Sequence, residues 1–441
     1  MRQEEKYTLE RQTKRSYLML RFKNGLHELM NNRLKGLIIW IYLIITLFAW
    51  LFKDIIFAYI PYDIYATADK KVINIVFPVC MIAGLIFLII VFGTPLGFKR
   101  INENLWRIGL VNHAGETPLL IKKRKYKKIR GVKIMEFKSN GIPQSEWENQ
   151  QDKIETALNI HIVKIVQGTD KKRIIIYTVS GNRNLPETIY WKDEYLSDNS
   201  FELVLGESLL GIETVNLAQI PHMLLGGSTG SGKSVLLKLL IMQCIKKGAT
   251  VFIADFKGGV DFPLVWQSRC RIVIEKKELV CTLNNIIDIL EERKGLLFGK
   301  ECANIDEYNS IAGNTLPRMI FACDEVAELL DKTGLSKDDK DLVTQIEGNL
   351  SIIARQGRAF GLHLILATQR PDATILTGQI RNNIDFRVCG RADNVLSQII
   401  LDNTGAADKI PKDAQGRFLT NDGIIFQGYL FDERKTFEKE K

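Results

Sequence analysis

The sequence lacks the cysteine spacings that mark metal sites. Its seven cysteines include no CxxC pair and no set with metal-ligand spacing, which argues against a structural metal centre. Most of them lie among apolar neighbours, a pattern typical of reduced core cysteines in a cytosolic compartment. The sequence also has no internal repeat and no low-complexity tract, so a repeat architecture is not indicated.

Length and composition allow more than one packed domain. The chain has 441 residues, of which 46% are hydrophobic. A net charge of +9 and a pI near 9.0 favour an anionic partner, either nucleic acid or a lipid surface. The mean hydropathy near zero hides an uneven distribution, because two apolar blocks precede residue 100 and the rest has the character of a soluble protein.

Two uncharged runs, residues 36–52 and 72–92, indicate transmembrane helices. A helix needs roughly 20 apolar residues to cross a bilayer core, and apolar residues 55–60 extend the first run. We therefore expect a transmembrane hairpin over 36–92, with spans at about 36–56 and 72–92. Buried core helices are the alternative, but such helices rarely stay apolar all round for this length. A signal peptide fits poorly, since the first run starts late and no small-residue cleavage site follows it.

The distribution of Lys and Arg predicts the orientation of this hairpin. Nine Lys or Arg precede the first span, three lie in the loop beside three aspartates, and the run KKRKYKKIR follows at 122–130. The positive-inside rule then places both termini in the cytoplasm, as in a multi-pass protein of the plasma membrane. The run 122–130 itself has three open interpretations, namely a solvated strand, a contact with the inner leaflet or a contact with DNA.

Turn-forming residues and periodic hydrophobic patterns divide the rest of the chain into segments. We expect an amphipathic helix from Ser145, with a serine cap, followed by strands at 161–166 and 173–179. The expected segments are a cytoplasmic basic N-terminus (1–35), the hairpin (36–92), a connector (93–118), a small α/β adaptor (119–200), an ATPase motor (201–430) and a charged tail (431–441).

From about residue 201, short apolar runs alternate with helical patterns, which indicates an α/β fold with a mostly parallel sheet. The expected strands are His222–Leu225, Thr250–Ala254, Arg271–Ile274, Arg318–Cys323, Leu362–Ala367 and Phe386–Cys389.

A phosphate-binding loop lies between the first of these strands and a helical pattern. The motif G-x-x-x-x-G-K-[ST] is matched without a gap by Gly227, Ser228, Thr229, Gly230, Ser231, Gly232, Lys233 and Ser234. Its backbone N–H groups and the following helix N-terminus would cradle the phosphates of ATP. Lys233 is expected to reach the β- and γ-phosphates, and Ser234 is expected to ligate Mg²⁺. A chance glycine loop is disfavoured by the strand before it and the helix after it.

Two further strand ends supply catalytic candidates. The strand RMIFACDE ends in Asp324, expected to hold Mg²⁺, and Glu325, expected to orient and deprotonate the attacking water. An acidic pair after a strand can also be a plain helix N-terminus, but its position after a phosphate-binding loop favours the catalytic interpretation. The strand LHLILATQRP ends at Thr368 and Gln369, where RecA-like cores place a polar residue that senses the γ-phosphate.

Together these motifs resemble the FtsK/SpoIIIE family of DNA translocases over roughly 201–430. The matching segments are PHMLLGGSTGSGKS (221–234), ADFKGG (254–259), IDEYN (305–309), the RMIFACDE strand, RQGRAFGLHLILATQRP (355–371) and LTGQIRNNIDFRVCGRADN (376–394). The resemblance implies a RecA-like P-loop core in a homo-oligomeric ring, typically a hexamer. It also implies that Arg358 acts in trans as an arginine finger. A surface arginine on a helix at 340–359 is the alternative, and Arg381, Arg387 and Arg391 are rival fingers.

The layout departs from that of chromosome translocases, which usually have four or more spans, a long linker and a C-terminal winged helix. Two spans and a short connector are more similar to the coupling ATPases of Gram-positive integrative conjugative elements. This similarity implies a membrane-anchored, ATP-driven DNA translocase in conjugative transfer, with sequence-independent DNA contacts and with relaxase and transfer-channel proteins as partners. The alternatives are an ATPase of type VII-like protein secretion, a chromosome-partitioning DNA pump and a non-hydrolysing membrane scaffold.

Overall fold

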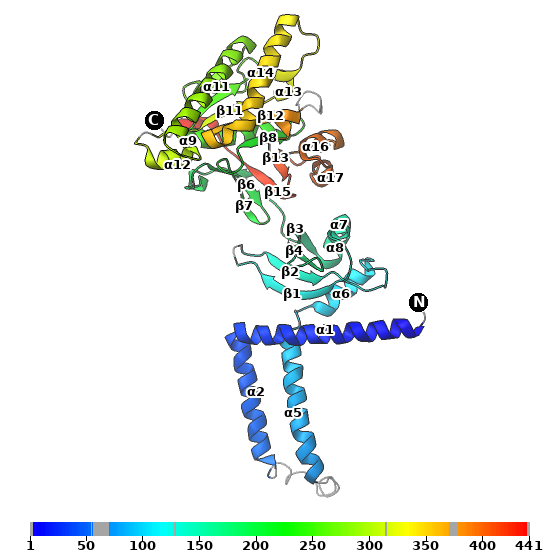
Figure 1. The fold of residues 1–441 in the computed structure, drawn as a ribbon. Coiled ribbons are helices and arrows are strands. Elements are labelled where there is room, and N and C mark those ends of the chain that lie inside the picture. Colours follow the sequence, from blue (N-terminus) through cyan, green and yellow to red (C-terminus); the bar gives the residue numbers. More distant parts are fainter. Residues whose placement is uncertain are drawn as a thin grey trace. The chain divides into compact units, whose positions relative to one another are not determined.

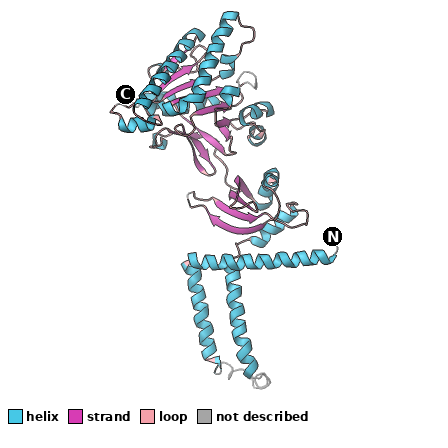
Figure 2. Cartoon of the chain, in the orientation of Figure 1, coloured by secondary structure: helices cyan, strands magenta, loops and turns pink. Residues whose placement is uncertain are grey.

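The computed structural model describes residues 3–53, 55, 70–127, 129–313, 315–369 and 378–438. The chain forms two compact units, Met1–Asn182 and Arg183–Lys441, whose helices and strands are distinguished in Figure 2. Residues 183–200, which the sequence analysis placed with the adaptor, lie in the second unit. The loop between the expected spans (54 and 56–69) and the last three residues of the expected tail lie outside the described residues.

The first unit begins with three long helices: α1 (Gln3–Asn31), α2 (Arg33–Leu51) and α5 (Lys70–Phe92). Segments Arg33–Leu51 and Asn74–Phe92 are long and apolar enough to cross a membrane, with 0% and 6% of their residues buried within the structure. A soluble core helix would be mostly buried. The exposure of these apolar side chains therefore favours a lipid environment.

The remainder of the first unit is a four-stranded sheet with helices on one face. The strands β1 (Leu119–Lys125), β2 (Lys133–Lys138), β3 (Ile160–Gln167) and β4 (Arg173–Ser180) pair antiparallel in the order β1-β2-β4-β3. The helices α6 (Phe98–Arg107), α7 (Gln144–Asn149) and α8 (Gln151–Leu158) cover its core, in which Trp147 and Ile154 are fully buried. Helix α6 lies in the segment expected to be a connector.

The serine cap expected at Ser145 is wrong. The N-cap is Pro143, whose extended backbone (φ −71°, ψ 161°) leads into a helix that begins at Gln144, so the cap lies two residues before Ser145. The expected single helix is also two helices, because Gln150 leaves helical geometry at ψ 13°.

The second unit is built on one large sheet. In the described part of the chain it has 11 strands, ordered β10-β9-β11-β12-β8-β13-β14-β15-β6-β7, with β5 paired to β15. The strands are β5 (Ile189–Tyr190), β6 (Glu202–Ser208), β7 (Gly211–Asn216), β8 (His222–Gly226), β9 (Thr250–Ala254), β10 (Arg271–Val273), β11 (Met319–Cys323), β12 (Leu362–Thr368), β13 (Phe386–Cys389), β14 (Arg417–Thr420) and β15 (Ile425–Leu430). The six strands from β10 to β13 are parallel, which confirms the expected α/β core and its six strands to within one residue at each end.

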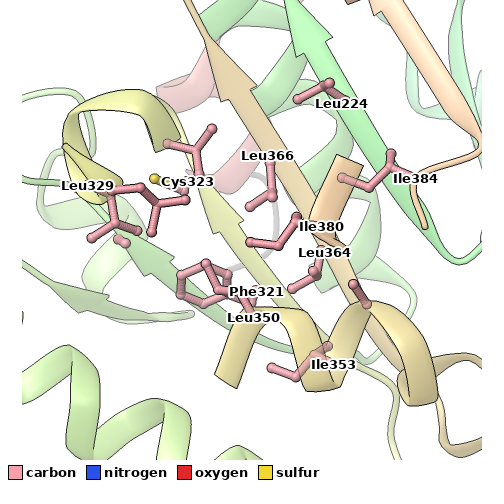
Figure 3. Packing of buried hydrophobic residues seen from close by; sticks show 14 of the residues in the cluster. Leu224, Phe321, Cys323, Leu329, Leu350, Ile353, Leu364, Leu366, Ile380 and Ile384 are labelled. Atoms are coloured by element: carbon pink, nitrogen blue, oxygen red, sulfur yellow. The ribbon is translucent and has the colours of Figure 1, made fainter. Parts of the chain in front are cut away.

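Helices cover both faces of this sheet. The main helices are α9 (Lys233–Lys246), α10 (Leu264–Gln267), α11 (Lys276–Gly299), α12 (Ile305–Ile311), α13 (Val326–Leu330), α14 (Lys337–Gln356), α15 (Gly378–Arg381), α16 (Asn394–Leu401), α17 (Gly405–Lys409) and α18 (Glu433–Glu438). Alternate residues of a strand enter opposite cores, as in β11, where Phe321 packs on the α11–α14 side and Ile320 on the α9 side. Figure 3 shows Phe321 and Leu364 beside Leu350 and Ile353 of α14.

Helix α18 occupies most of the segment expected to be a charged tail. Its Phe437 is buried against Trp266, with ring centroids 4.9 Å apart. The Glu433 carboxylate accepts hydrogen bonds from Trp266 Nε1 at 2.6 Å and from Lys238 Nζ at 2.7 Å. This end of the chain is thus packed against α9, the helix that follows the phosphate-binding loop.

Candidate nucleotide-binding site

The phosphate-binding loop follows β8 and ends at the start of α9, as the sequence predicts. Gly227, Gly230 and Gly232 have φ values of 154°, 76° and 93°, which favour glycine. A Cβ atom on Gly227 would overlap Ser231 Oγ, and one on Gly232 would lie 2.9 Å from Gly416 Cα. The glycines are therefore required both by the backbone conformation and by the close packing around the loop.

Neighbouring segments hold the loop in place. Ser228 N–H donates to Arg391 O at 2.7 Å, and the Arg391 guanidinium donates to Thr229 O at 2.6 Å and to Lys412 O at 2.7 Å. On the other side, Gly416 N–H donates to Ser231 O at 2.9 Å. The loop is thus fixed by the segment after β13 and by the start of β14.

Asp324 is the centre of the charged part of the site. Its Oδ1 accepts from Lys233 Nζ at 2.8 Å and from Ser234 Oγ at 2.9 Å, and its Oδ2 accepts from Lys257 Nζ at 3.1 Å. Burial alone would raise the pKa of Asp324, but Lys233, Ser234 and Lys257 lower it below its usual value. The carboxylate is therefore kept ionised and aimed at the loop.

Lys257, from the ADFKGG segment, is a site residue that the sequence analysis did not single out. Its ammonium joins Asp324 to Asp261, at 3.1 and 3.0 Å. Burial opposes the charge of Lys257, but these two carboxylates raise its pKa above the usual value. The segment was recognised only as part of a family pattern, and nothing local in it shows that the lysine reaches Asp324.

Glu325 is held by the end of β12. Its carboxylate accepts from Thr368 Oγ1 at 2.7 Å and from Gln369 N–H at 2.9 Å. The Gln369 side-chain oxygen in turn accepts from Thr229 Oγ1 at 2.8 Å. A continuous hydrogen-bond chain therefore joins the phosphate-binding loop, the end of β12 and the acidic pair, and Gln369 lies at its centre.

Arg358 lies at the opposite end of β12 from this network. The helix expected at 340–359 ends at Gln356, and Arg358 belongs to a 3₁₀ turn, Gly357–Phe360, that leads into β12. Thr368 pairs with Gly226 at the end of β8, so the seven-residue strand separates Arg358 from its own loop by roughly 20 Å. Arg358 is exposed, and the described residues include no hydrogen-bond or ion-pair partner for its side chain.

The three rival arginines are engaged within the chain. Arg387 donates to Asp402 Oδ2 at 2.6 Å, and Arg381 also pairs with Asp402. Arg391 supports its own phosphate-binding loop. Of the four, Arg358 alone is without such a partner in the described part of the chain.

The residues present fit a nucleotide with a divalent metal. The Ser234 hydroxyl and the Asp324 carboxylate are hard oxygen ligands of the kind Mg²⁺ prefers, and they lie 2.9 Å apart. Ser231 Oγ is buried without a hydrogen-bond partner among the described residues, in the close packing between Gly227 and Gly390 that shapes the loop. A cavity of about 550 Å³, lined by Gly232, Val235 and Gln427 among others, adjoins the loop and is large enough for a nucleoside.

The parallel sheet, the loop after its central strand β8 and the acidic pair after β11 define a P-loop nucleoside triphosphatase with a RecA-like core. The FtsK/SpoIIIE family model matches residues 190–373. The chain belongs to the FtsK/SpoIIIE family.

Known proteins similar to the chain include one solved structure that it covers almost completely. The conjugation coupling protein TcpA of pCW3, solved as a monomer with ATPγS, is 34% identical, with a TM-score of 0.58, over 78% of this chain and 99% of that one. The DNA translocase FtsK of Treponema pallidum is 30% identical over 285 residues, which are 60% of this chain and 34% of that protein. FtsK of Helicobacter pylori strain J99 is 32% identical over 225 residues, 48% of this chain and 25% of that protein. The chain thus spans about a third or less of the length of these curated relatives.

Proposed function

We propose that the protein is a membrane-anchored, ATP-driven DNA translocase that acts as a coupling protein in conjugative transfer. The observation that carries this proposal is the similarity to TcpA at 34% identity over 99% of the solved chain, because it extends over 78% of this chain, which is more than the motor alone. The two exposed apolar helices support the membrane anchor, and the positive net charge supports sequence-independent contacts with DNA phosphates.

The contacts of the site residues support a proposed role in ATP hydrolysis for each of them. Lys233 would bind the β- and γ-phosphates, and Ser234 and Asp324 would hold Mg²⁺. When bound, Mg²⁺ supplies positive charge that offsets the charge on the phosphate oxygens. Glu325 would accept a proton from the attacking water, and Thr368 and the Gln369 N–H hold its carboxylate in position.

The position of Arg358 supports the proposed ring. Because Arg358 lies at the far end of β12 from its own phosphate-binding loop, it can assist hydrolysis only in a neighbouring subunit. We expect Arg358→Ala to retain ATP binding and to lose most hydrolysis. Mixing it with Lys233→Ala subunits should restore part of the activity, since some interfaces then pair an intact loop with an intact finger. Near-normal activity of Arg358→Ala alone would show that this arginine is only a surface residue.

The orientation of the anchor can be tested separately. Reporters fused at the N-terminus and after Lys441 should report the cytoplasm, and one inserted near Tyr62 should report the outside. Export of the C-terminal fusion would contradict a cytosolic motor.

The function itself is tested with the full-length protein in lipid nanodiscs. ATP hydrolysis should be stimulated by DNA, and crosslinked DNA should co-purify with the protein from cells. Lys233→Ala should weaken nucleotide use broadly, whereas Glu325→Gln should bind ATP and turn over slowly. An assembled protein that hydrolyses ATP without any response to DNA would favour a protein-export motor instead.

A further inference from the structure

Helix α1 lies across the ends of the two apolar helices (Figure 1). Asn32 alone separates it from α2, and the Asn32 side chain caps α2 by accepting hydrogen bonds from the N–H groups of Leu34 and Lys35. Helix α1 also touches the end of α5 closely, because a Cβ atom on Gly25 would overlap the Ile89 carbonyl. The start of α2 and the end of α5 therefore both lie at the level of α1.

One side of α1 is fixed to the adaptor. The Arg21 guanidinium is buried and donates to Leu120 O at 2.7 Å and to Gly93 O at 3.2 Å. Asn24 donates to Ile121 O at 3.4 Å. These bonds connect α1 to β1 and to the residue that follows α5, so the Arg21–Asn24 side faces the adaptor sheet.

The opposite side of α1 is apolar and exposed. Leu18, Met19, Leu26 and Met30 expose 50%, 75%, 43% and 86% of their surface. At 100° per residue these four side chains occupy an arc about 120° wide, whose centre lies opposite Asn24. The apolar arc therefore points away from the adaptor.

We propose that this arc lies in the headgroup and acyl-chain boundary of the inner leaflet, so that α1 is a third membrane-contacting helix, running in the plane of the bilayer. The inference rests on the proposed membrane anchoring by α2 and α5. A 19-residue span rises about 28 Å, close to the thickness of a hydrocarbon core, so the start of α2 and the end of α5 lie at a bilayer surface.

The adaptor bonded to one side of α1 is polar and belongs in the cytosol, which leaves the bilayer on the other side. Exposed Lys23 borders the apolar arc, where its ammonium can reach lipid phosphates while its stem stays among acyl chains. Continuity with the two spans thus favours lipid over a second copy of the chain as the occupant of this face.

Photo-crosslinking in the full-length protein tests the proposal without removing native cysteines. The photoreactive residue p-benzoyl-phenylalanine replaces Leu26, His27 or Ile44, one at a time, in liposomes of phosphatidylethanolamine and phosphatidylglycerol. Ile44 is 63% exposed in the middle of α2, and His27 is exposed on α1 outside the apolar arc. After illumination, mass spectrometry measures the mass shift of one phospholipid on the labelled peptide.

We expect lipid adducts at positions 26 and 44 and no lipid adducts at position 27. Crosslinked dimers at position 26 would show that a second copy of the chain covers this face. If position 26 formed no adduct with lipid or with protein, the face would be in contact with water. Each of these results would overturn the proposal. Equal adducts at 26 and 27 would also overturn it, because the apolar arc would then have no defined orientation. Absence of lipid adducts at position 44 would instead refute the membrane anchor itself.

Discussion

The hydrogen bond from Thr368 Oγ1 to Glu325 gives a sharp test of how the end of β12 acts on hydrolysis. Thr368→Val keeps the shape of the side chain and removes its hydroxyl, at a site that is 4% exposed. Loss of a hydrogen bond to an ionised group costs about 1.5–3 kcal/mol. If that bond orients Glu325 for proton abstraction, kcat should fall by about 10- to 150-fold.

The same substitution leaves the contacts of Lys233 and Ser234 in place, so nucleotide affinity should change little. Turnover is measured by phosphate release from the assembled protein, and affinity by titration with a fluorescent ATP analogue. Thr368→Ser, which keeps the hydroxyl, is the matched control and should retain most activity. Wild-type turnover of Thr368→Val, or equal losses in the valine and serine variants, would refute the role assigned to this bond.

Three further outcomes follow from the site and the sheet. Arg391→Met should raise KM by loosening its own loop and, unlike Arg358→Ala, should gain nothing from mixing with Lys233→Ala subunits in the hydrolysis assay. Gly232→Ala should abolish ATP-analogue binding because its Cβ would press on Gly416. Gly248→Ala, also at positive φ but with nothing within 4 Å, should bind normally and cost only about 1 kcal/mol in thermal melts. Burial lowers the pKa of His222 to about 4, whereas its value in the unfolded chain is about 6.5. Between these two pH values the unfolded chain binds a proton at His222 that the folded protein does not. The contribution of His222 to the free energy of unfolding should therefore be fully present above pH 6.5 and should fall by about 3 kcal/mol as the pH decreases to 4. Melting curves of the wild type and of His222→Gln across this range check the slope, which should be smaller in the variant; buried His363, whose pKa is also lowered, supplies the slope that remains.

The parts predicted well from sequence are those whose signal is local. Strands such as Thr250–Ala254 and Phe386–Cys389 were predicted to the residue, because buried parallel strands are continuous apolar runs between breakers. The phosphate-binding loop was equally evident, since its glycines and lysine form one contiguous motif.

The parts missed depend on contacts between distant segments. Lys257 and Asp324 are 67 residues apart, and no periodic pattern in the sequence indicates that their side chains are in contact. Arg391 was considered as a finger, although its contact with Thr229, 162 residues away, makes it a support of its own loop. The antiparallel strands β6, β7, β14 and β15 were not predicted either, because their sequences are neither continuous apolar runs nor strongly alternating. Helix α1 could not be recognised as an apolar surface without knowing which side of it the adaptor covers.

The central place of β8 in the sheet has a consequence for how the protein is made. His222 of β8 hydrogen-bonds Leu364 of β12, 142 residues later in the chain. At a synthesis rate of 5–20 residues per second, β8 leaves the ribosome about 7–28 s before its partner exists. During that time the backbone groups on both edges of this apolar strand are unpaired, which makes the nascent motor a substrate for chaperones and prone to pair with other chains. The first unit is complete before β8 is synthesised, so slower translation of the region between residues 226 and 362 should raise the fraction of motor that misfolds.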